Sequence, residues 1–226
     1  YGGQRMWTAL GTSFALGLLA TVAVNRANWQ DLRVWCAFAV GGGVFFAVQF
    51  VARPLGVLLA YLAGGEGLSS WLVVAVGVVF AEVFKLTAAM ALHQLYRGPR
   101  PEGGGLGAAV GAGFGAWSEA VILRSAFQVA QLGLPGGVSV GAVLAASMAR
   151  LLGAAGSTGL ATRLATSGRT LAGLGLAAAA QLVLDPGVRV VAPSPRWTVA
   201  LTALVGVGLF AAVWVSGRRA EEGRCR

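Results

Sequence analysis

Apolar residues dominate long stretches of this chain, and short clusters of charged and turn-forming residues separate them. A helix that crosses a bilayer needs about 20 largely apolar residues. Because helices satisfy their own backbone hydrogen bonds in lipid, the pattern predicts an all-α fold, a polytopic transmembrane helix bundle that forms one integral membrane domain over 1–226. The seven predicted spans are about 7–24, 33–63, 69–95, 105–132, 138–162, 170–184 and 197–216.

Two of these segments have unusual lengths. Segment 33–63 is too long for one straight crossing, and Arg53-Pro54 interrupts it. Since proline lacks a backbone donor and clashes with the preceding turn, we expect either a kink there or a short interfacial piece from 54 to 63. Segment 170–184 is short and rich in alanine, so losing it would change the span count by one.

The composition excludes an ordinary soluble domain, because 57% of the residues are hydrophobic, 11% are charged and the mean hydropathy is +0.75. The net charge of +9 raises the question of nucleic-acid binding, and the positions of the arginines answer it. With seven spans, ten arginines fall on one side and three on the other, which by the positive-inside rule predicts an outside N-terminus and a cytoplasmic C-terminus. The basic loops therefore indicate topology and contacts with anionic membrane lipids rather than with nucleic acid. The ten are Arg26, Arg33, Arg97, Arg100, Arg163, Arg169, Arg218, Arg219, Arg224 and Arg226, and the three are Arg5, Arg189 and Arg196.

Many of the 35 glycines lie inside the predicted spans. Gly107, Gly111 and Gly115 share one helix face, and small residues at this spacing let two helix backbones approach closely. The alternative is that these glycines leave room for a substrate beside Glu119. Trp117 also lies in the middle of a span, where it is either part of the core or a wall of a pocket.

Ionisable residues inside the spans are the strongest functional signal. An unpaired charge at the bilayer centre costs about 2.5 to 3.5 kcal/mol on insertion scales, so we expect these side chains to pair and to face the bundle interior. We predict the pairs Glu82 with Lys85, at i and i+3 on one helix, and Glu119 with Arg150. The six such residues are Arg53, Glu82, Lys85, Glu119, Arg124 and Arg150.

Histidine and cysteine are scarce. The one histidine, His93, lies 11 residues after Glu82, so the two are about 16 Å apart along a helix and cannot share a metal ion. We expect His93 to be an interfacial residue. Cys36 and Cys225 lie far apart and match no metal-site spacing. The sequence therefore predicts no metal and no cofactor.

Three segments in this order carry a family resemblance: Gly-Gly-Val-Phe-Phe-Ala-Val-Gln-Phe-Val-Ala-Arg-Pro-Leu (42–55), Ala-Glu-Val-Phe-Lys-Leu (81–86) and Gly-Ala-Gly-Phe-Gly-Ala-Trp-Ser-Glu-Ala (111–120). Together they resemble the YhfC family of intramembrane metalloproteases, which is related to the PrsW and CAAX-protease groups. The resemblance covers roughly residues 35–185. It implies that Glu82 and Lys85 correspond to a motif whose carboxylate acts as base on a metal-bound water, that Glu119 is the glutamate of a second motif, and that Arg150 is a family arginine.

The chain departs from that family at the metal ligands. Ala81 replaces a leading glutamate, and Phe114 stands near a position that is often histidine. Gly-Ser at 156–157 occupies the region of a ligand histidine, and Gln181, four residues before Asp185, stands where the resemblance implies another. Because catalytic zinc usually takes three protein ligands, these departures predict a pseudoenzyme that keeps the bundle but does not cleave peptide bonds.

No other catalytic set is apparent. Ser157 in Ala-Gly-Ser-Thr-Gly has no histidine base nearby. A shared-proton acid dyad is not expected either, because neither Glu82 nor Glu119 occurs in the flanking sequence known for such enzymes. We therefore expect a non-catalytic scaffold or binding protein of a bacterial plasma membrane, which contacts membrane lipids and binds another membrane protein or transmembrane helix. The alternatives are a small-solute or ion transporter component and an active protease with non-standard ligands. The expected binding residues are Glu82, Lys85, Trp117, Glu119, Arg150 and Gln181.

Overall fold

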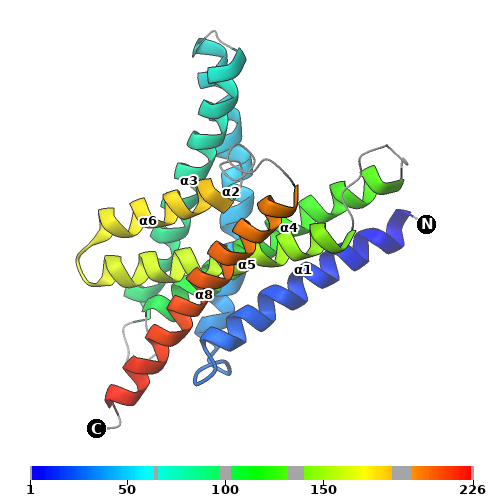
Figure 1. The fold of residues 1–226 in the computed structure, drawn as a ribbon. Helices are drawn as coiled ribbons and strands as arrows, with labels where there is room; N and C mark the ends of the chain where they lie inside the picture. Colours follow the sequence, from blue (N-terminus) through cyan, green and yellow to red (C-terminus); the bar gives the residue numbers. More distant parts are fainter. Residues whose placement is uncertain (1, 64–65, 97–102, 132–139, 185–194, 225–226) are drawn as a thin grey trace.

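A computed structural model describes residues 2–63, 66–96, 103–131, 140–184 and 195–224. Within these ranges the regular structure is helical, so the predicted all-α class is confirmed (Figure 1). The helices are α1 (Gly2–Val24), α2 (Leu32–Ala63), α3 (Glu66–Leu95), α4 (Gly103–Gln131), α5 (Val140–Thr166), α6 (Thr170–Leu182) and α8 (Pro195–Arg224).

Five of the described helices are long and apolar enough to cross a membrane, which indicates an integral membrane protein. The sixth predicted segment is helical, as α6, but it is not among the five: its 13 residues rise only about 20 Å, and a bilayer core is about 30 Å thick. The total of seven spans stays a prediction. The five candidate spans are Leu32–Leu59, Val74–Leu95, Gly104–Ser125, Gly141–Thr166 and Ala200–Gly217, and the shorter apolar stretches are Leu10–Val24 and Thr170–Leu182.

Helix α2 continues through Pro54 and ends at Ala63. The alternative of a separate piece over 54–63 is therefore wrong. A helix in apolar surroundings tolerates one missing donor better than a break, because a break leaves several backbone groups without partners. The side chain of Arg53, which precedes this proline, lies outside the described part of the chain.

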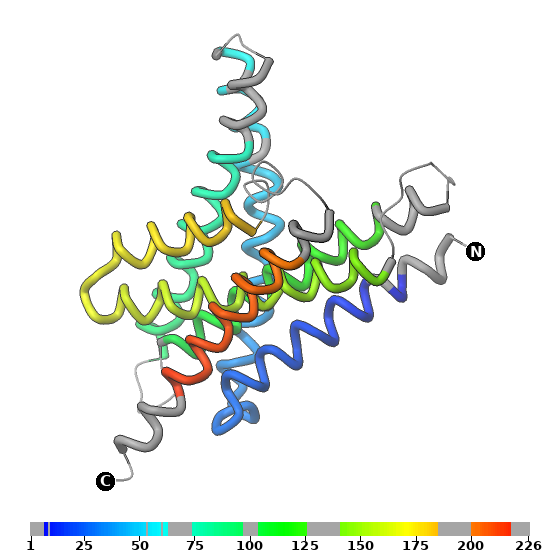
Figure 2. Tube along the Cα trace, viewed as in Figure 1, coloured from blue at the N-terminus to red at the C-terminus, as the bar shows by residue number. Residues whose placement is uncertain are grey.

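Helix α4 lies at the centre of the molecule and packs against α1, α2 and α5 (Figure 2). Residues 106–116 of α4 are buried without exception. On the α2 side, a Cβ added to Gly113 would overlap the backbone carbonyl of Phe38, and one added to Gly41 would overlap that of Val110. The two helix backbones are in direct contact there, which only glycine permits.

The ridge of Gly107, Gly111 and Gly115 lies on the α5 side of α4. A Cβ on Gly111 would overlap the carbonyl of Ala154, and one on Gly107 would overlap the Thr162 side chain. The predicted close helix packing is confirmed. The alternative of substrate room at this ridge is wrong, because α5 fills the space.

A tight turn joins α5 to α6. Gly168 has a φ of +84°, a conformation that favours glycine. The Arg169 N–H donates to the carbonyl of Leu164 at 2.8 Å, and the Gly168 N–H donates to that of Ala165 at 3.0 Å. This pair of bonds is a Schellman motif, which ends α5 and fixes where α6 begins.

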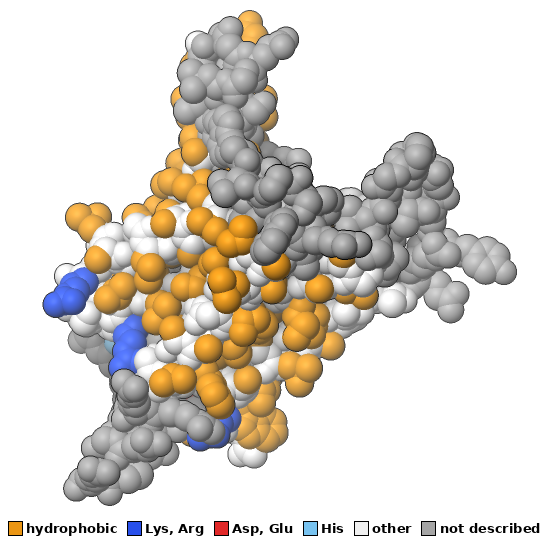
Figure 3. All heavy atoms as spheres, viewed as in Figure 1, with side chains coloured by type: hydrophobic (Ala, Val, Ile, Leu, Met, Phe, Trp, Pro, Cys, Tyr) orange, Lys and Arg blue, Asp and Glu red, His pale blue; other side chains and the backbone are white. Residues whose placement is uncertain are grey.

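Several connections lie at one end of the molecule. In Figure 1 the α5–α6 turn lies at the left, the α1–α2 turn at the bottom, and the C-terminal end of α8 between them at the lower left. The basic side chains visible in Figure 3 gather on that side, and apolar side chains cover much of the remaining visible surface. Arg26, Arg163 and Arg169, in or beside these turns, are exposed. The predicted basic positions at 97, 100 and 189 lie outside the described residues.

Candidate functional site

The first charged pair joins neighbouring turns of α3. Lys85 Nζ donates a hydrogen bond to Glu82 Oε1, and the two side chains are 0% and 1% exposed. The same ammonium group lies 4.8 Å from the centroid of the Phe114 ring in α4. The predicted Glu82–Lys85 pair is confirmed, and an aromatic face of α4 adds a cation–π contact to it.

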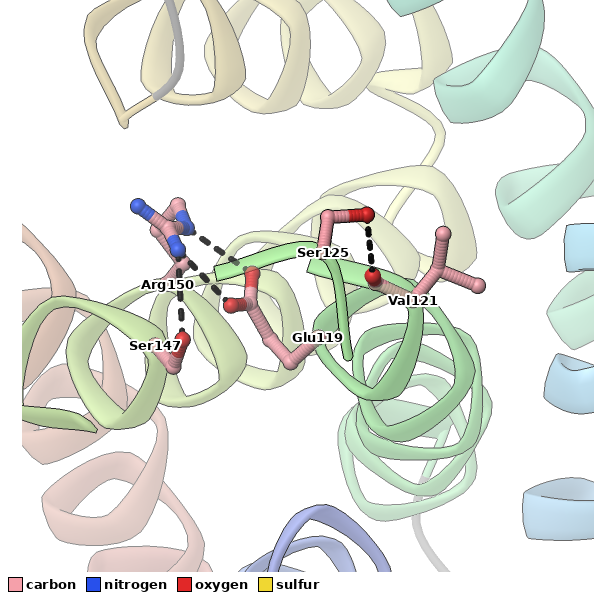
Figure 4. A network of polar contacts seen from close by, with 5 residues as sticks. All are labelled: Glu119, Val121, Ser125, Ser147 and Arg150. Atoms are coloured by element: carbon pink, nitrogen blue, oxygen red, sulfur yellow. Dashed lines mark hydrogen bonds and ion pairs between the residues drawn. The ribbon is translucent and has the colours of Figure 1, made fainter. Parts of the chain in front are cut away.

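The second charged pair joins α4 to α5 (Figure 4). Arg150 Nε donates to Glu119 Oε1 and Arg150 Nη2 donates to Glu119 Oε2, each at 2.8 Å. Nη2 also donates to the Ser147 hydroxyl at 3.2 Å. The predicted Glu119–Arg150 pair is confirmed, in the two-pronged geometry that gives arginine its strongest ion pairs.

The two pairs contact different faces of α4. The Phe114 ring contacts the Lys85 ammonium group, and Glu119 lies five residues further along α4. At 100° per residue, the two side chains point about 140° apart around the helix axis. Phe114 belongs to the apolar cluster that α2 and α3 form with α4, which includes Phe45 and Ala81. The buried charges therefore form two separate pairs, one on the α3 side of α4 and one on its α5 side.

Trp117 belongs to an aromatic cluster and not to the Glu119 pair. Its ring lies 5.0 Å from that of Phe14 and 4.9 Å from that of Phe46, measured between centroids, both in edge-to-face arrangements. A Cβ on Gly42 would meet its indole nitrogen. Trp117 therefore packs against α1 and α2, which confirms the core interpretation rather than the pocket wall.

The other expected residues lie apart from both pairs. Gln181 is buried near the end of α6, and Asp185 lies outside the described residues. His93 is half-buried in the last turn of α3, and Arg124 is exposed.

Two buried polar residues, Ser147 and Asn25, were not selected from the sequence. Ser147 is 2% exposed and supports Arg150 from one turn earlier, a spacing that is visible in the sequence. Asn25 is 5% exposed, and its Nδ2 donates to the carbonyls of Thr21 and Gly105, each at 3.1 Å. The Gly105 partner is 80 residues away, so no local pattern could have identified this contact.

The arrangement is suited to holding helices together. Each deep carboxylate accepts from a cation within hydrogen-bond distance, which balances the buried charges. Among the described side chains, no group of three or more His, Cys, Asp or Glu lies together in a way that would bind a metal ion.

Comparisons with protein-family models, curated proteins and solved structures found no match for this chain. The resemblance to YhfC-type proteases therefore stays a prediction that rests on the residues quoted above.

Proposed function

We propose that this chain is a non-catalytic integral membrane protein that acts as a scaffold for another membrane protein. The main support is that both deep carboxylates are paired with cations inside the fold. Both oxygens of Glu119 accept from Arg150, and Oε1 of Glu82 accepts from Lys85. These charges stabilise helix packing.

Catalysis by these glutamates would require a different arrangement. A general base or a zinc ligand needs a carboxylate oxygen directed at the substrate, the attacking water or the metal. In this fold the oxygens of Glu119 point at a guanidinium that occupies that position. We therefore propose that the chain, if related to the YhfC-type proteases, is a pseudoenzyme.

A transport role is the second candidate, and one observation favours it. The Arg150 side chain is 17% exposed and Glu119 is 5% exposed, whereas Lys85 and Glu82 are fully buried. A charged pair with limited access inside a membrane protein is the kind of group that marks ion or proton paths.

The exposed basic residues also indicate how the protein is oriented in the membrane. The exposed arginines of the α1–α2 and α5–α6 turns lie at the end that also holds the end of α8, where the sequence places four more arginines. By the positive-inside rule, we propose that this end faces the cytoplasm of a bacterial plasma membrane and that the N-terminus lies outside.

The functional test compares the purified wild type with Glu82→Gln and Glu119→Gln. We expect no stoichiometric metal, no cleavage of a transmembrane peptide and no ion flux in proteoliposomes. Metal or proteolysis that disappears in either variant would show an active protease. Flux that disappears in Glu119→Gln but persists in Glu82→Gln would support the transport candidate.

The scaffold role needs a positive result as well. A photoreactive residue would replace one exposed apolar residue at a time, on three different helices, and the protein would be irradiated in native membranes. The three positions are Phe50, Leu171 and Leu204, and the buried Val110 is the control position. We expect one adduct of constant mass from at least one exposed position and none from position 110. Absence of any adduct from all three would count against a scaffold.

A further inference from the structure

An open groove of about 380 Å³ runs between α3 and α6. Its wall is mostly apolar along α3 and becomes polar where α3 ends and α6 begins. The apolar lining includes Val83, Leu86, Met90 and Leu174, with Thr87 as one polar residue among them, and the polar end is formed by Gln94 and Thr170.

Leu86, which lines the groove, also belongs to a buried cluster with small residues of α5 and α6. Leu86 packs with Ala161, Ala165 and Ala177 in one buried cluster of α3, α5 and α6. A Cβ added to Gly173 would meet the carbonyl of Ala161, so α6 lies directly on α5. These contacts hold α3, α5 and α6 together beside the groove.

The length of the groove matches one leaflet of a bilayer. From Val83 to Gln94 is 11 residues, which is about 16 Å along α3. Half of a hydrocarbon core is about 15 Å thick. An apolar chain lying in the groove would therefore reach from the polar end to about the middle of the membrane.

A positively charged residue lies next to the polar end of the groove. Arg169 directly precedes Thr170, is exposed, and forms no ion pair within the described part of the chain. The Schellman turn at Gly168 fixes the backbone of Arg169 at this place. The groove thus has a mostly apolar body and a polar end, and the chain places the exposed Arg169 directly beside its lining residue Thr170. This arrangement complements a molecule with an apolar chain and an anionic head.

We propose that this groove binds an anionic diacyl phospholipid, with one acyl chain between α3 and α6 and the phosphate beside Arg169. A lipid fits better than a partner helix because polarity and charge change along the groove, from its membrane-midplane end to its basic end. The inference rests on the membrane location of the protein and not on its scaffold role.

Native mass spectrometry of the full chain, released from detergent micelles, tests the site. The protein would be mixed with phosphatidylglycerol or with phosphatidylcholine of the same acyl chains. Ala91→Trp fills the groove, since Ala91 lines it, and Arg169→Gln removes the charge. The matched controls are Ala172→Trp, on an exposed face of α6 outside the groove, and Arg163→Gln, an exposed arginine at the end of α5.

We expect the wild type and both controls to retain one phosphatidylglycerol in preference to phosphatidylcholine. Arg169→Gln should lower the association constant for phosphatidylglycerol about fivefold, as expected for one basic residue at a membrane surface, and Ala91→Trp should remove the bound lipid. Circular dichroism would verify that each variant keeps its helix content. Because lipid retention does not involve the scaffold partner, either proposal can fail alone.

Three outcomes would overturn the inference. The two lipids could bind equally, or Arg169→Gln could lose no more lipid than Arg163→Gln. The third is that Ala91→Trp leaves lipid binding unchanged but abolishes a cross-linked membrane protein, which would assign the groove to a partner helix.

Discussion

The guanidinium of Arg150 in α5 meets the carboxylate of Glu119 in α4 through two parallel hydrogen bonds of 2.8 Å each. The two helices also pack closely along the ridge of Gly107, Gly111 and Gly115, so the ion pair lies at the end of a tight helix interface. Helix packing and charge pairing therefore depend on each other in this part of the protein.

Removing Arg150 should destabilise the protein more than removing the charge of Glu119. Arg150→Met leaves a carboxylate that is 5% exposed without its cation, and breaking such a pair costs about 3 to 5 kcal/mol. Glu119→Gln instead leaves the guanidinium of Arg150 without its carboxylate. The Arg150 side chain is longer and 17% exposed, so it can extend toward water, and the loss of stability should be smaller. Reversible unfolding in mixed micelles measures both.

The double variant Glu119→Gln with Arg150→Met is the control for that experiment. It should recover much of the stability lost in Arg150→Met, because no uncompensated charge remains. If the double variant were as unstable as the sum of the two single variants, the pair would not act as a unit.

Phe114 should be coupled energetically to Lys85. In Phe114→Leu, most of the volume remains but the ring that faces the ammonium group is lost, which should cost about 2 kcal/mol for a desolvated cation–π contact. In a Lys85→Met background the same substitution should cost clearly less. Phe45→Leu is the control, since Phe45 contacts the Phe114 ring from α2 and shares its apolar cluster. Equal losses in both backgrounds would contradict the coupling.

Glycine-to-alanine substitutions should have opposite signs at two positions. Gly113→Ala places a methyl group against the Phe38 carbonyl and should destabilise by about 1 to 3 kcal/mol or more. Gly208→Ala meets no atom within 4 Å and should stabilise the helix by about 0.5 to 1 kcal/mol. Thermal unfolding in detergent distinguishes them, and equal shifts would show that α2 and α4 are not in contact at Gly113.

Labelling of single cysteines tests the orientation. In a background without Cys36 and Cys225, a cysteine at Ser167 in the α5–α6 turn should react with a membrane-impermeant thiol reagent only after the cells are opened. A cysteine at Gly141, at the start of α5, should react in intact cells. The reverse pattern would place the basic end outside, against the positive-inside rule.

Much of this architecture follows from local sequence. The lengths of the apolar segments predicted the helices, and the one-turn spacing of Glu82 and Lys85 predicted their ion pair, because both are properties of a single helix. The Glu119–Arg150 pair was also predicted, since two deep and opposite charges on neighbouring segments have few other ways to be compensated.

The sequence alone thus determined the helical class, the apolar surface and the need to pair the buried charges. Only the tertiary structure decided that the pairs contact different faces of α4, that Trp117 packs with Phe14 and Phe46, and that α3 and α6 border a groove. The reason is physical: hydropathy and helical spacing act along one segment, whereas the rotation and separation of two helices depend on contacts between residues far apart in the chain.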